Sequence, residues 1–169
     1  MKILDATTVI AFLREMDFAD GLRRLSTLHR LVVPHAVVAE VSKPPSKELL
    51  SVLLRESVLV ERSPSTHAVQ ALRERFLALG PGEVECVVLA RASAEDATPY
   101  VVSDDRTVRR HCPDVRFIWT GQLLHYMLEH RLITSEEMEG LLGKLGKSSF
   151  YSRRLSDDHA PENREPLRR

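Results

Sequence analysis

The chain has 169 residues, of which 43% are hydrophobic, and its 24 Lys and Arg residues balance its 24 Asp and Glu residues. This length suits one domain with a proper hydrophobic core. No apolar stretch approaches the roughly 20 residues that cross a bilayer, so we expect a cytoplasmic protein without a membrane segment. Because Lys and Arg contact nucleic-acid phosphates, the neutral balance means that any basic surface is local. Cys86 and Cys112 stand in no disulfide or metal-ligand spacing, and no histidine pair has the spacing of a zinc site.

Five short segments rich in apolar and β-branched residues have the pattern of strands. They lie at residues 2–4, 31–33, 58–60, 100–102 and 116–118. Each is followed by a polar or turn residue, which is typical of strands that are covered on both faces. The sequence therefore predicts a parallel sheet.

Longer segments between these strands have helical patterns. We expect helices over residues 8–28, with an interruption near residues 17–21, and over 34–41, 46–55, 66–79, 83–94, 105–110 and 134–145. Strands that alternate with helices form a parallel sheet between two helical layers. The sequence therefore predicts one three-layer α/β/α domain over residues 1–155, and a charged, disordered tail over residues 156–169.

Local signals predict several helix ends. Pro34 suits the first position of a helix, because its missing N–H costs nothing there. The Gly-Pro-Gly turn at residues 80–82 ends one helix and lets the next begin at Glu83. Thr134, with Glu137 three residues later, has the pattern of a capping box.

Acidic residues stand where the predicted strands end. Asp5 follows the first strand, and Asp104 and Asp105 follow the fourth. Glu40 lies on the helix after the second strand, and Glu83 begins the helix after the glycine turn. The loops at the carboxyl ends of parallel strands converge on one crevice. We therefore expect these acids to share one site.

Such a cluster has a chemical implication. Carboxylates that crowd together raise one another's pKa and cost stability unless a cation neutralises them. Oxygen ligands suit Mg²⁺ or Mn²⁺, which can activate water for phosphodiester hydrolysis. Each acid taken singly is, however, explained more simply as a helix cap or turn residue. Spacing alone does not separate these interpretations.

Four segments resemble the four motifs of PIN domains, in that family's order. Residues 1–10 (MKILDATTVI) resemble the first motif, a hydrophobic strand followed by Asp and then by Ser or Thr. Residues 32–41 (VVPHAVVAEV) resemble the second, with a proline before a helical glutamate. Residues 80–90 (GPGEVECVVLA) resemble the third, and residues 101–106 (VVSDDR) resemble the fourth, Ser-x-Asp after a strand. Residues 120–155 resemble a PIN subfamily with two appended helices, from which Gln122 departs.

The resemblance implies a role for each acid. Asp5, Glu83 and Asp105 would bind Mg²⁺ or Mn²⁺. Glu40 would orient a metal-bound water or contact a second ion. The resemblance therefore implies that the three-layer domain has a PIN-like fold, with these carboxylates as its active site.

Two of these assignments have alternatives. Glu85 is the alternative to Glu83, which we favour because it puts Ala90 where the family has a small helix residue. Asp104 is retained as a further candidate metal ligand, although the Ser-x-Asp pattern favours Asp105. On that choice, Asp104 is expected to face solvent or to cap the following helix, and Glu85 is expected to be solvated.

Neighbouring residues have expected supporting roles. The resemblance implies that Thr7 and Ser103 hydrogen-bond the carboxylates. The candidate RNA-binding residues are Arg106, Arg109 and Arg110, although arginines on a helix face are more often simply solvated. We expect Cys86 to be a small core residue, and Trp119 to pack under the terminal helices rather than to stack on a base.

The resemblance implies an endoribonuclease that hydrolyses single-stranded RNA with metal-activated water. It further implies a VapC-like toxin of a toxin–antitoxin pair, with an antitoxin partner and a homodimer. The alternative is a non-catalytic PIN domain that binds RNA or a protein partner, and the presence of all the motif acids favours the enzyme. A phosphatase of the haloacid-dehalogenase type is disfavoured, because it needs a second aspartate where Thr7 stands.

Overall fold

The sheet is the centre of the molecule. The computed structural model describes residues 1–93 and 99–148, in which five strands have the order β3-β2-β1-β4-β5. The strands are β1 (Lys2–Leu4), β2 (Leu31–Pro34), β3 (Leu59–Arg62), β4 (Tyr100–Val102) and β5 (Arg116–Ile118). Every neighbouring pair is parallel, as the alternation of strands and helices predicts.

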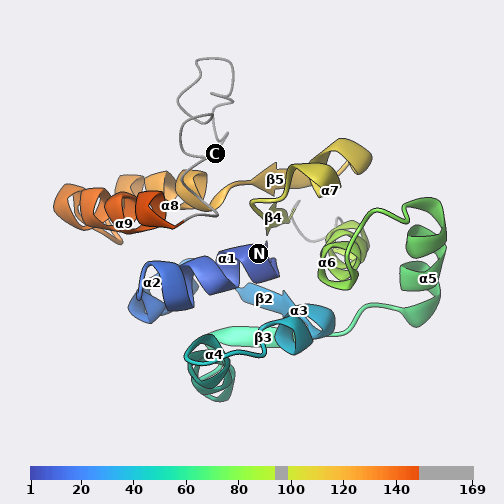
Figure 1. The fold of residues 1–169 in the computed structure, drawn as a ribbon, viewed down its shortest axis with the longest axis horizontal. Coiled ribbons are helices and arrows are strands. Elements are labelled where there is room, and N and C mark those ends of the chain that lie inside the picture. The colour runs from blue at the N-terminus through green and yellow to red at the C-terminus, as the bar shows by residue number, and fades with distance from the viewer. Residues whose placement is uncertain (94–98, 149–169) are drawn as a thin grey trace.

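Helices join the strands and cover both faces. They are α1 (Ala6–Ile10), the π-helix η1 (Ala11–Glu15), α2 (Ala19–Ser26), α3 (His35–Glu40), α4 (Ser46–Arg55), α5 (Thr66–Arg75), α6 (Pro81–Ala92), α7 (Arg106–His111), α8 (Thr120–Glu129) and α9 (Ser135–Lys147). Figure 1 shows α2, α8 and α9 on one side of the sheet, and α5 and α6 on the other. The predicted three-layer α/β/α fold is therefore confirmed.

The core lies on both faces of the central strand. Ile3 and Leu4 of β1 are fully buried. On the helical layers, Phe12 of η1 and Val87 of α6 are also fully buried. Each such side chain stabilises the fold by roughly 1.5–3 kcal/mol relative to an exposed one. Cys86 is buried and forms no disulfide, so its predicted place in the core is confirmed.

The first helix begins earlier than predicted. It starts at Ala6 rather than at residue 8, because Asp5 is the extended N-cap with φ −79° and ψ 163°. The predicted interruption near residue 17 is confirmed, since Asp17 has the left-handed φ of 50°. The π-helical turn that precedes it was not predicted.

Other boundaries differ by a few residues. Pro34 is the last residue of β2 and the N-cap of α3, one position before the predicted helical position, because its ψ is 153°. Helix α5 ends at Arg75, where Phe76 leaves helical geometry with φ −132°. The capping box is confirmed, because Glu137 N donates to Thr134 Oγ1 over 3.1 Å and Thr134 N donates to Glu137 Oε2 over 2.8 Å.

Two expectations concern the ends of the chain. The predicted tail at residues 156–169, and the end of the predicted helix at residue 94, lie outside the described residues. Within residues 1–93 and 99–148, no helix is both long enough and apolar enough to cross a membrane.

Candidate active site

The site is built where the central strands β1 and β4 end. Their parallel pairing brings Leu4 opposite Val102, so the residues that follow each strand meet at one edge of the sheet. Asp5 N donates to Val102 O over 3.0 Å. This backbone contact holds Asp5 beside the segment that carries the fourth acidic motif.

Two hydroxyl groups hold the Asp5 carboxylate. Ser103 Oγ donates to Asp5 Oδ2 over 2.9 Å, and Thr7 Oγ1 donates to the same oxygen over 3.0 Å. The structure thus places both residues where the resemblance assigns them. A carboxylate held in this way cannot rotate freely, which is the orienting effect that metal ligands usually need.

Asp5 is buried, with 3% of its surface exposed. Burial raises the pKa of Asp5 above its ordinary value, and the hydrogen bonds from Ser103 and Thr7 lower it part of the way back. The charge of Glu40 raises this pKa further. The ionised form of Asp5 is therefore disfavoured in this environment.

Glu83 is the third residue of α6 and closes the start of that helix. Gly80 N donates to Glu83 Oε2 over 2.8 Å. Burial raises the pKa of Glu83 to about 7, and the charges of Asp105, Asp5 and Glu40 add to that effect. The charges of acids from three other segments therefore act on the Glu83 carboxyl.

Glu40 reaches from the end of α3 to the start of α6. Its Oε1 atom accepts a hydrogen bond from Gly82 N over 2.9 Å. A Cβ atom on residue 82 would lie 2.9 Å from this oxygen and 3.1 Å from Val37 Cγ2. Glycine at position 82 therefore permits the close approach of α3 and α6 that holds Glu40.

Asp105 is the N-cap of α7. Its Oδ1 atom accepts from Thr107 N over 2.6 Å, and Asp105 N donates to Ser103 Oγ over 3.2 Å. Ser103 therefore contacts both Asp5 and Asp105, and it fixes the separation of the first and fourth acidic motifs.

Asp104 does not face solvent, and it does not cap α7. Only 4% of its surface is exposed. Thr120 N donates to its Oδ1 atom over 2.9 Å, and Thr120 Oγ1 donates to its Oδ2 atom over 2.6 Å. The expectation of an exposed Asp104 is wrong because the chain turns after β4 and directs this carboxylate to the first residue of α8. Both oxygens have partners, so the geometry favours a structural role over metal binding.

Glu85 is only partly exposed, and its carboxylate makes a contact that was not expected. Its Oε2 atom accepts from Ala36 N over 2.9 Å, at the beginning of α3. The sequence does not reveal this contact, because it depends on how α3 packs on α6. Because the Glu85 carboxylate already accepts this bond from α3, Glu83 is the better candidate metal ligand.

Two of the three predicted RNA-binding arginines, Arg106 and Arg109, lie beside a buried aromatic ring. Trp119 is only 8% exposed, so a packing role fits it better than base stacking. The guanidinium groups of Arg106 and Arg109 lie 5.9 Å and 5.5 Å from the Trp119 ring centroid, within cation–π range. Arg110 is exposed.

The donor set suits a hard divalent metal in its chemistry. Asp5, Glu83 and Asp105 offer carboxylate oxygens, and the charges of Asp105 and Asp5 raise the pKa of Glu83. In the part of the chain that the structure describes, however, no group of three His, Cys, Asp or Glu side chains is arranged to hold a metal ion. The structure thus brings the acids to one edge of the sheet without giving them ligand geometry.

Sequence reasoning missed two supporting residues. Thr120 holds Asp104, and Gly82 holds Glu40. The sequence does contain a signal for Thr120. This residue stands shortly after β5, just as Asp5 and Asp104 stand shortly after β1 and β4. The role of Gly82 had no such signal, since a glycine beside Pro81 is explained by the turn alone.

Comparison with known proteins bears on the same residues. A family model described as a PIN domain matches residues 1–158. This match includes every acid described above as well as Thr120. No curated protein and no solved structure matched the chain.

Proposed function

The chain belongs to the PIN-domain family, and on that premise we propose that it is a metal-dependent endoribonuclease that hydrolyses single-stranded RNA. PIN domains are generally nucleases and generally bind divalent metals. The observation that carries the proposal is that Ser103 joins Asp5 and Asp105 at one edge of the sheet, where the charges of Asp105, Asp5 and Glu40 raise the pKa of Glu83. Crowded carboxylates at the carboxyl edge of a parallel sheet are stabilised by a cation.

The roles of the residues follow from their contacts. Asp5, Glu83 and Asp105 would hold Mg²⁺ or Mn²⁺. The bound ion would lower the pKa of a water molecule and stabilise the charge on the phosphate. Glu40, held by Gly82 N, would accept a hydrogen bond from the attacking water and orient it. Ser103 would keep Asp5 in place for this chemistry.

We further propose that this nuclease is a VapC-like toxin that works in the cytoplasm with an antitoxin partner and as a homodimer. The family supports this, because PIN domains commonly act on RNA and in toxin–antitoxin pairs. The test is expression in a host cell. Growth should stop when the protein is made alone and should recover when a small protein from the neighbouring reading frame is made with it. Size-exclusion chromatography tests the dimer.

One observation favours a second candidate, a PIN domain that binds RNA or a protein partner without cleaving. Glu83 and Asp105 each accept a hydrogen bond from the start of a helix. Among the described residues no side-chain group is arranged for a metal. These facts are compatible with two roles: the acids could serve only as helix caps, or they could be metal ligands in a metal-free protein.

Cleavage of a labelled single-stranded RNA distinguishes the two candidates. The enzyme should cut with Mg²⁺ or Mn²⁺ and stop with excess chelator, and Asp5→Asn should be inactive although folded. RNA binding without cleavage by wild-type protein, in either metal, would favour the binding module. Equal cleavage by wild type and Asp5→Asn would point to a contaminating nuclease and would contradict the proposed site.

A further inference from the structure

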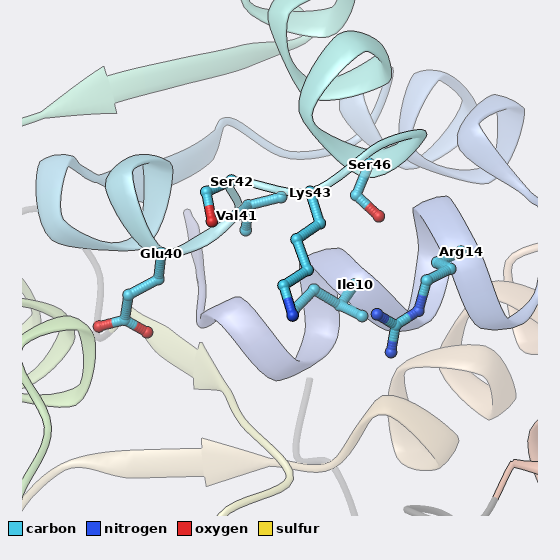
Figure 2. A pocket seen from close by; sticks show the side chains of 7 residues that line it. All are labelled: Ile10, Arg14, Glu40, Val41, Ser42, Lys43 and Ser46. Carbon is cyan, nitrogen blue, oxygen red and sulfur yellow. The ribbon is translucent and has the colours of Figure 1, made fainter.

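A pocket of about 200 Å³ lies next to the acidic site. Figure 2 shows it between α1 and η1 on one side and the link from α3 to α4 on the other. Its polar lining comes from Arg14, Glu40, Ser42, Lys43 and Ser46. Because Glu40 belongs both to this pocket and to the acidic site, the two are adjacent.

The pocket has a cationic half. In Figure 2 the side chains of Arg14 and Lys43 extend in the same direction, on either side of Ile10. The Glu40 carboxylate lies apart from both cations and accepts its hydrogen bond from Gly82 N. The charge therefore changes sign across the pocket, from positive at Arg14 and Lys43 to negative at Glu40.

The positive charge of Lys43 is open to a ligand, whereas that of Arg14 is shared with Glu15. Lys43 is exposed, and it makes no ion pair with any residue in ranges 1–93 and 99–148. The Arg14 side chain is 50% exposed, but its Nε and Nη2 atoms both donate to Glu15 Oε1, so Glu15 offsets part of its charge. An anion in the pocket would gain charge-assisted hydrogen bonds from both side chains.

The backbone beneath Lys43 is constrained. Pro44 and Pro45 follow it, and their rings fix φ. Lys47 N donates to Lys43 O over 3.1 Å, which ties the residue to the first turn of α4. Ser46, 3% exposed, lines the pocket at the start of that helix, where the positive end of the helix dipole also favours an anion.

We propose that Arg14, Lys43 and Ser46 bind a backbone phosphate of the RNA that lies next to the scissile phosphate. This proposal rests on the proposed nuclease function. It adds the path that the single-stranded RNA takes across the protein surface. A single strand that passes along Glu40 would have one phosphate at the acids and a neighbouring phosphate in the cationic half of the pocket. The site would then select a flexible strand whose successive phosphates can occupy both positions.

The first experiment measures RNA binding without cleavage. An RNA oligonucleotide is titrated in chelator at several salt concentrations, with Lys43→Gln, Arg14→Gln and, as the matched control, Lys47→Gln. Lys47 is an exposed lysine nearby that does not line the pocket. Loss of one phosphate contact should reduce the slope of log affinity against log salt by about 0.7, which is about fivefold in affinity at 0.1 M salt. Lys43→Arg should keep most of the binding.

A second experiment locates the phosphate. Each phosphate beside the cut site is replaced in turn by an uncharged methylphosphonate. At one linkage the replacement should weaken binding to wild type by about fivefold and should have almost no further effect on Lys43→Gln. Melting curves with midpoints equal to wild type check that each variant is folded, and Lys43→Met, which also removes the charge, replaces Lys43→Gln if that variant is not.

The outcomes separate the two proposals. If wild type binds and cleaves RNA but Lys43→Gln and Lys47→Gln lose equal affinity, the pocket proposal is wrong and the nuclease proposal stands. If wild type neither binds nor cleaves single-stranded RNA, both are wrong. A selective loss at Lys43 and Arg14, matched to one methylphosphonate position, supports the pocket.

Discussion

Gly82 and Glu40 meet where α6 begins and α3 ends, with the Gly82 N–H directed at a Glu40 carboxylate oxygen 2.9 Å away. Because a Cβ atom on residue 82 would lie 2.9 Å from that oxygen, we predict that Gly82→Ala displaces the carboxylate. A displacement near 1 Å in a catalytic group costs about 10²-fold in rate. RNA cleavage should fall by that order, while circular dichroism shows a folded protein.

Gly140→Ala is the matched control for this change. Gly140 lies in α9 with nothing within 4 Å of its Cβ direction. The substitution should raise the free energy of unfolding by about 1 kcal/mol through helix propensity and leave cleavage unchanged. Equal activity of Gly82→Ala and wild type would show that Glu40 needs no fixed position.

Asp104 and Asp105 should separate stability from chemistry. Asp104→Ala leaves the buried Thr120 N–H without its acceptor, which should cost about 1–3 kcal/mol of stability in urea unfolding. Thr120→Val should be less than additive with it, because both variants remove the bond from Thr120 Oγ1 to Asp104 Oδ2. Asp105→Asn should keep the melting temperature but lose RNA cleavage by about 100-fold or more, as the loss of a metal ligand would. The reverse pattern would mean that our placement of the fourth motif is off by one residue.

Metal affinity should depend on pH through Glu83. Its pKa is raised to about 7, and a protonated carboxyl is a poor ligand, so Mn²⁺ should bind more weakly as pH falls through 7. Below that value the loss should approach tenfold per pH unit, as measured by calorimetry at pH 6 and pH 8. Glu83→Gln should bind weakly at both values. A wild-type affinity that is the same at both would argue against Glu83 as a ligand.

The same raised pKa predicts the stability of the metal-free protein. Between the unfolded pKa of 4.5 and the folded pKa of about 7, the folded state binds more protons than the unfolded state. The free energy of unfolding should therefore fall as pH rises through this range. Glu83→Gln, which can still accept the bond from Gly80 N, should weaken that fall and be the more stable protein at pH 8 in chelator.

Lys2 should give the opposite dependence at higher pH. It is 4% exposed, its ammonium lies 4.2 Å from the Tyr100 ring centroid, and burial lowers its pKa from 10.5 to about 8. Between these values the unfolded chain binds more protons, so stability should rise with pH, by roughly 1–3 kcal/mol from pH 7 to pH 10. Lys2→Met should remove this rise, and Lys47→Met, an exposed control, should keep it.

The sequence predicted the sheet because β1, β2 and β4 are short, largely buried apolar runs, and their length and the helical patterns between them favour strands. It also predicted that the acids gather, because parallel strands put their carboxyl ends at one edge. The sequence did not predict the direction in which each side chain points after its strand ends. Asp104 shows why: past Val102 the backbone leaves strand geometry, so the alternation of sides no longer applies.

Features that depend on packing between distant helices had no sequence signal. Glu85 reads as a solvated helix residue until α3 is seen to begin beside it. Arg14 and Lys43 read as ordinary surface cations until η1 and the link before α4 lie together. In each case the local sequence is compatible with several environments, and tertiary contacts select one.

Under the proposed function, the bond from Ser103 to Asp5 also constrains when the chain could cleave RNA during its own synthesis. This bond joins residues 98 positions apart. Ser103 directly follows β4, the strand that lies next to β1 in the sheet. A ribosome therefore exposes Asp5 long before it makes the serine that orients it. Chains that stop short of β4 lack both this hydroxyl and the last acid, so premature termination releases fragments without a complete site. The proposed nuclease activity would therefore require synthesis at least as far as Asp105.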